Sequence, residues 1–122
     1  MKSRDTLIRL KRFHLEEKRR RVRQIEMTLA EFARIATELD REIANEEKRA
    51  GITDPHHFAY PTYARAASVR RDNLKRSIAE LVAQIEESRS AEEEAQAELS
   101  KIEALESRDK ANDGSSEVLA RA

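Results

Sequence analysis

The sequence of 122 residues contains no cysteine and no tryptophan, and it has only two glycines, two prolines and five aromatic residues. The absence of cysteine excludes disulfides and thiolate metal sites and is typical of a reducing intracellular location. No apolar run approaches the ~20 residues of a transmembrane helix, and the N-terminal segment lacks the apolar stretch of a signal peptide. We therefore expect a cytoplasmic protein without direct membrane insertion.

Charge is abundant but segregated along the chain. Charged residues make up 39% of the sequence and hydrophobic residues another 39%, a profile typical of coiled coils and long helices within a single domain. Residues 1–25 contain ten Lys or Arg and three acids, a net charge of +7, whereas residues 86–106 contain eight acids and two bases, a net charge of −6. The two segments would attract each other in a chain that folds back on itself.

Both prolines and one of the two glycines lie within residues 51–61. This segment predicts a loop between a first helix over about 3–50 and a second over about 62–108, followed by a flexible polar tail over 109–122. Ser3 is the expected N-cap of the first helix, and Gly51 is the expected left-handed residue after it. Within the loop, Asp54 followed by Pro55 indicates one short turn.

An apolar stripe at heptad spacing marks each predicted helix. The first has ten apolar members of thirteen: Ile8, Lys11, Leu15, Lys18, Val22, Ile25, Leu29, Phe32, Ala36, Leu39, Ile43, Glu46 and Ala50. The second has ten of fourteen: Tyr60, Ala64, Ala67, Arg71, Leu74, Ile78, Leu81, Ile85, Ser88, Glu92, Ala95, Leu99, Ile102 and Glu106.

A short loop cannot join two parallel rods of about 65–70 Å, so the helices must run antiparallel. Residue i then faces approximately residue 112 − i, which brings Lys18 within about one turn of Glu92. An uninterrupted parallel dimer is the rival arrangement, but it would place two basic segments side by side and leave both prolines inside a rod. The sequence therefore predicts an all-α fold, a long antiparallel two-helix coiled-coil hairpin over residues 1–108.

Two groups of residues are candidates for partner binding. Leu10 and Phe13 fall outside the stripe among Arg9, Lys11 and Arg12, and aromatic and arginine side chains are common interface anchors. Alternatively, these are ordinary scattered apolar residues, or a stutter rotates Leu7 and Leu10 inward. The second group, in and beside the loop, either closes the hairpin end or forms a recognition tip: Phe58, Tyr60 and Tyr63.

No residues form a recognisable catalytic, metal or cofactor site. The sequence contains no nucleophile–base pair and no phosphate-binding glycine loop, and the adjacent His56 and His57 lack a third metal ligand. We therefore expect neither enzymatic activity nor a cofactor. A basic segment beside heptads superficially resembles a basic zipper, but Ile8, Leu15 and Val22 commit that segment to the seam, so nucleic-acid binding is the weakest alternative.

Two segments of the chain are distinctive beyond their heptads. One is the opening Met1-Lys2-Ser3-Arg4-Asp5-Thr6-Leu7-Ile8-Arg9-Leu10-Lys11-Arg12-Phe13. The more specific one is His57-Phe58-Ala59-Tyr60-Pro61-Thr62-Tyr63-Ala64-Arg65-Ala66-Ala67, which runs on to Arg70-Arg71-Asp72-Asn73-Leu74-Lys75. Both resemble the flagellar export protein FliJ family in its short form. The similarity covers roughly residues 1–108, and the polar end from Asp109 is shorter than the helical extension expected for the family.

This resemblance implies an antiparallel coiled coil that serves as an accessory of the flagellar type III export apparatus, peripheral to the inner membrane. It also implies that the rod, similar to the central stalk of rotary ATPases, contacts the hexameric export ATPase ring, the export gate membrane protein and export chaperones. The family has no short motif from which individual contact residues transfer. The alternative from the residues alone is a generic coiled-coil scaffold that self-associates into a four-helix bundle.

Overall fold

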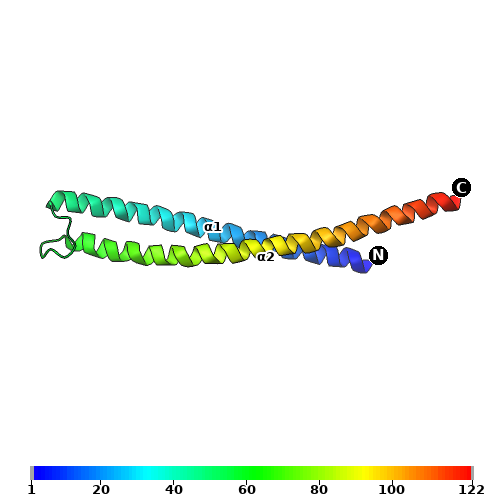
Figure 1. Cartoon of the computed structure of the whole chain (residues 1–122), viewed down its shortest axis with the longest axis horizontal. Coiled ribbons are helices and arrows are strands. Elements are labelled where there is room, and N and C mark those ends of the chain that lie inside the picture. The colour runs from blue at the N-terminus through cyan, green and yellow to red at the C-terminus, as the bar shows by residue number, and fades with distance from the viewer. Residues whose placement is uncertain (1, 122) are drawn as a thin grey trace. The chain divides into compact units, whose positions relative to one another are not determined.

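The computed structural model describes the backbone of residues 2–121 and the side chains of residues 3–114. It contains two helices, α1 over Lys2–Ala50 and α2 over Thr62–Arg121, joined by the loop of residues 51–61 (Figure 1). The helices pack against each other as an antiparallel hairpin, so the predicted all-α fold is confirmed.

Gly51 ends α1 because its φ of 70° takes the backbone into the left-handed region, which disfavours residues with a Cβ. The N–H groups of Gly51 and Ile52 donate to the carbonyl oxygen of Glu47, at 2.8 and 3.3 Å, and so satisfy the end of the helix. Lys48 and Arg49 in the last turn place positive charge at the negative end of the helix dipole.

The loop contains the turn predicted at Asp54. One carboxylate oxygen of Asp54 accepts a hydrogen bond from the N–H of His56 at 2.9 Å, and its carbonyl oxygen accepts one from the N–H of His57 at 3.1 Å. The carbonyl oxygen of Pro61 then accepts a hydrogen bond from the N–H of Arg65 at 3.1 Å, so α2 starts directly behind this proline as expected.

The chain forms two compact units, each built from part of both helices. The loop unit comprises residues 23–86 and contains a buried cluster of Leu39, Ile43, Tyr60, Ala64 and Ala67. The terminal unit comprises residues 1–22 and 87–122 and contains a buried cluster of Ile8, Leu15 and Leu99. All of these residues belong to the predicted stripes.

The stripes and the register agree closely with the structure. All fourteen members of the second stripe and eleven of the thirteen in the first are buried or half-buried; Lys18 and Ala50 are the exceptions. Within the loop unit Arg71 pairs with Asp40, and within the terminal unit Arg19 pairs with Glu92, so that both pairs have residue numbers that sum to 111. Lys18 shares a hollow with Ser88 and Ala91, within one turn of Glu92 as expected, but it stays exposed, and Arg19 makes the ion pair with Glu92.

Two predicted boundaries are also wrong. α1 begins at Lys2, so Ser3 lies inside the first turn and is not the N-cap. α2 does not end near residue 108 but continues to Arg121, through most of the predicted tail. Extending an existing helix costs less than starting one, and Glu106 supports the extension by pairing with Lys110 one turn further on, at 3.7 Å.

Candidate binding surfaces

One side of the seam in the terminal unit is closed by polar pairs between the helices. Arg12 donates a hydrogen bond to the carboxylate of Glu103 at 2.9 Å, and Arg19 donates one to the side-chain oxygen of Gln96 at 3.0 Å. We call this side the paired flank. Arg12, predicted as a partner contact, is therefore already occupied by a carboxylate of its own chain.

The other side of the seam carries one strong ion pair. Lys11 Nζ lies 2.8 Å from a carboxylate oxygen of Glu98. This hydrogen bond and the charge of Lys11 lower the pKa of Glu98 below its usual range, and the charges of His14 and Lys101 act in the same direction. The helices therefore bring His14, Lys101 and Glu98 together on this side.

Four large apolar side chains are exposed near this ion pair. We call them the apolar flank; they are Leu7, Leu10, Phe13 and Leu105, with exposed fractions of 40%, 48%, 59% and 43%. Leu7 precedes His14 by one heptad and Leu105 follows Glu98 by one heptad, so the antiparallel register places both leucines on the same side of the seam. The inward rotation of Leu7 and Leu10 considered above does not occur.

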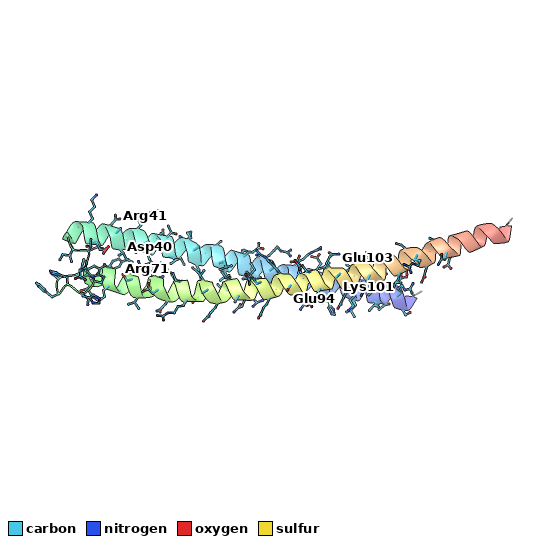
Figure 2. The ribbon with its side chains drawn as sticks, in the orientation of Figure 1. Asp40, Arg41, Arg71, Glu94, Lys101 and Glu103 are labelled. Carbon is cyan, nitrogen blue, oxygen red and sulfur yellow. The ribbon has the colours of Figure 1, made fainter. Side chains whose placement is uncertain are left out.

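The structure thus divides the predicted cluster of Arg9, Leu10, Arg12 and Phe13. Leu10 and Phe13 belong to the apolar flank, Arg12 belongs to the paired flank, and Arg9 is exposed. From α2 the structure adds Leu105, which was not among the predicted binding residues. Figure 2 shows Lys101 and Glu103 on different sides of α2, which agrees with the separation of the two flanks.

The three aromatic residues of the loop region have different surroundings. Tyr60 is 5% exposed, and its hydroxyl donates a hydrogen bond to the carboxylate of Glu47 at 3.2 Å. The hydroxyl of Tyr63 donates to Glu42 at 2.7 Å, although its ring is half exposed. Phe58 is 94% exposed and stacks only on the ring of His57, with centroids 4.7 Å apart. Tyr60 therefore closes the hairpin, while Phe58 is available as a tip residue.

The two tyrosines also show the electrostatic effect of their partners. Burial, followed by the charge of Glu47, raises the pKa of Tyr60, whereas for Tyr63 the hydrogen bond to Glu42 is the main cause of a raised pKa. Further along the same unit, Arg71 donates a hydrogen bond to Asp40 at 3.0 Å (Figure 2). These three contacts join α2 to α1 close to the loop.

Within residues 3–114, no cluster of three or more His, Asp or Glu side chains has the arrangement of a metal site. Neither helix, over its described residues, has a stretch of the length and apolarity needed to cross a membrane. Comparison with protein-family models, with curated proteins and with solved structures yields no match for this chain. A functional assignment must therefore start from the two exposed surfaces and the segments that build the hairpin.

Proposed function

We propose that this protein is a non-enzymatic accessory of the flagellar type III export apparatus. It is cytoplasmic and peripheral to the inner membrane, and it binds the export ATPase ring together with the export gate or export chaperones. In this role the hairpin acts as a rigid adaptor and carries out no chemistry of its own.

The observation that carries the proposal is where the resemblance to the FliJ family falls. The more specific of the two similar segments contains Tyr60, Ala64 and Ala67, which form the buried end of the hairpin with Leu39 and Ile43 of α1. Coiled coils resemble one another easily at heptad positions, but a block that combines a proline turn, two tyrosines and a close alanine contact is less common. The similarity thus concerns a particular way of closing a hairpin.

The exposed apolar flank is a second support for a binding role. Leu7, Leu10, Phe13 and Leu105 lie in the terminal unit, and the other similar segment includes the first three of them. A coiled coil that worked alone would gain nothing from four exposed large apolar residues gathered on one side, and such gathered residues commonly mark interaction sites.

Deletion of the gene in its natural host tests the proposed role. Loss or reduction of swimming and of filament assembly, restored by the intact gene on a plasmid, is the expected result. Restoration should fail with Leu10→Asp and Phe13→Asp combined and succeed with Met27→Asp, which alters an exposed apolar residue of the loop unit. Normal swimming of the deletion strain would contradict the proposal.

A direct binding experiment tests the mechanism. The tagged full-length chain should recover the export ATPase or a gate component from cell extract, and the double variant of Leu10 and Phe13 should recover much less. Recovery of neither component, or equal recovery by the double variant, would exclude this mechanism.

The two alternatives predict different results. A self-associating scaffold would show a concentration-dependent dimer in light scattering at micromolar concentration. A nucleic-acid binder would be retained on DNA, with retention that falls steeply as salt rises. Arg4, Lys11, Arg12 and Arg19 contact carboxylates of α2, which leaves fewer cations of the basic segment for phosphate groups.

A further inference from the structure

The apolar flank has cations along its α2 edge. Lys101 and Arg108 lie one turn before and after Leu105. Among the side chains of residues 3–114, neither cation has a carboxylate oxygen within ion-pair distance. Arg9 instead lines the hollow beside Arg12 and Glu103 on the paired flank. The surface is therefore apolar along α1 and positive along its α2 margin.

The shape of this surface is elongated. Leu7, Leu10 and Phe13 follow one another at three-residue intervals over about 9 Å of α1, and Leu105 adds apolar surface across the seam from Leu7. A helix with one apolar side matches such a strip, because its side chains at positions i, i+3 and i+4 form a strip of similar width. Negative side chains along the edge of that helix that faces α2 would meet these cations.

We propose that the apolar flank binds an acidic amphipathic helix of a partner protein. This proposal deepens the function proposed above. It rests on that function only for the identity of the protein that supplies the helix, a component of the export apparatus. Leu10 and Phe13 anchor the apolar side of the bound helix, while Lys101 and Arg108 select carboxylates at its edge and disfavour a basic helix.

A second copy of this chain fits the surface less well. Its acidic segment, residues 86–106, supplies carboxylates but has only one exposed leucine among the described residues, Leu105. Its own apolar flank supplies leucines, but these are edged by the same positive charges and would repel. Each candidate segment of a second copy therefore satisfies one requirement of the surface and fails the other.

Fluorescence anisotropy with the full-length chain and designed peptides tests the proposal. The probe is a fluorescein-labelled helical peptide with leucine at heptad a and d positions and glutamate at the flanking positions. One control peptide has lysine in place of glutamate, and another has the acidic composition in shuffled order. We expect the acidic amphipathic peptide to bind at least about tenfold more tightly than either control and to weaken as salt rises.

Variants of the chain locate the binding site. Leu10→Asp and Leu105→Asp should each weaken binding of the acidic peptide about tenfold, and so should Lys101→Glu combined with Arg108→Glu. Met27→Asp and Arg41→Glu are matched controls, since both alter exposed residues of the loop unit and should leave binding unchanged. All six altered side chains are exposed, so circular dichroism should show unchanged helicity in every variant.

Several results would overturn the proposal: equal binding of the shuffled or lysine peptide, or full binding by the Leu10 and Leu105 variants. Dimerisation of the chain that Leu10→Asp abolishes would assign the surface to a second copy. Co-sedimentation with anionic lipid vesicles that is lost in the same variants would assign the surface to membrane binding.

The peptide experiment does not depend on motility. Normal swimming of the deletion strain beside flank-dependent peptide binding would therefore reject the export role alone, whereas lost swimming beside absent peptide binding would reject the acidic helix alone.

Discussion

The hydroxyl of Tyr60 donates a hydrogen bond to the carboxylate of Glu47 at 3.2 Å, which connects the end of the loop to the last turn of α1. The ring of Tyr60 packs in the core of the loop unit, and the guanidinium of Arg65 lies 5.8 Å from the ring centroid. Two residues earlier, Phe58 has almost no contact with the rest of the chain. Neighbouring aromatic residues thus have opposite roles.

This difference predicts opposite effects of two alanine substitutions. Tyr60→Ala removes a buried ring and leaves a cavity beside Leu39 and Ile43, so we expect the thermal midpoint to fall by about 10 °C. Phe58→Ala removes an exposed ring and should change the midpoint by no more than about 2 °C. Circular dichroism at 222 nm measures both; equal effects of the two substitutions would show that Tyr60 does not close the hairpin.

The two glycines of the chain form a second matched pair. Gly51 has a φ of 70°, and a Cβ there would meet no atom within 4 Å, so the cost of Gly51→Ala comes from backbone conformation alone. We expect a loss of roughly 1–2 kcal/mol in the free energy of unfolding.

Gly114 lies inside α2, where alanine is a better helix former. Gly114→Ala should therefore increase helicity near residue 114 and stabilise the helix by about 0.5–1 kcal/mol. Hydrogen exchange of the amides around each site checks both substitutions. A destabilising effect at Gly114 would indicate that α2 ends before this residue in solution.

The ion pair between Lys11 and Glu98 predicts a particular dependence on pH. Because the hydrogen bond from Lys11 lowers the pKa of Glu98 in the folded chain, the pair contributes stability that is present above the ordinary pKa of 4.5 and is lost as pH falls through the lowered value. Carboxyl titration by NMR should show a rise of the Glu98 pKa in Lys11→Met and no change in Lys18→Met. An unchanged pKa in Lys11→Met would contradict the pairing.

The two units should respond differently to salt. In the terminal unit, contacts between the helices include ion pairs of Arg4, Lys11, Arg12 and Arg19 with carboxylates of α2, beside a cluster of three buried residues. The loop unit instead has a larger buried core and one ion pair between its helices, Arg71 with Asp40, among the residues of that unit that the structure describes.

Salt screens exposed charges but not buried apolar contacts. Raising NaCl from 0.05 to about 1 M should therefore accelerate amide exchange in residues 4–19 and 92–106 more than in residues 36–74. A uniform change along the chain would show that the terminal ion pairs add little to local stability. Arg12→Glu alone should weaken the salt response of the terminal unit, because it removes one ion pair. The double variant Arg12→Glu with Glu103→Arg should restore the wild-type salt response.

The sequence predicted the exposed apolar residues of α1, but it did not predict which other residues lie beside them. The exposure of Leu10 and Phe13 follows from their distance from the heptad stripe, which the sequence displays directly. The sequence did not show that Arg12 lies on the other side of the seam from Leu10, where Glu103 is within reach. The contribution of Leu105 depends on register between two helices, and a one-turn shift would have removed it.

The sequence by itself determined the two helices, their antiparallel direction and their approximate register. Heptad spacing sets which side of each helix is buried, and the loop with glycine and proline turns the chain back on itself. Only the tertiary structure decided which charged side chain pairs with Glu92 and why Tyr60 is buried while Phe58 is exposed. These outcomes depend on the reach of long side chains and on packing across the seam, where differences of one residue or a few ångströms select between partners that the sequence leaves equivalent.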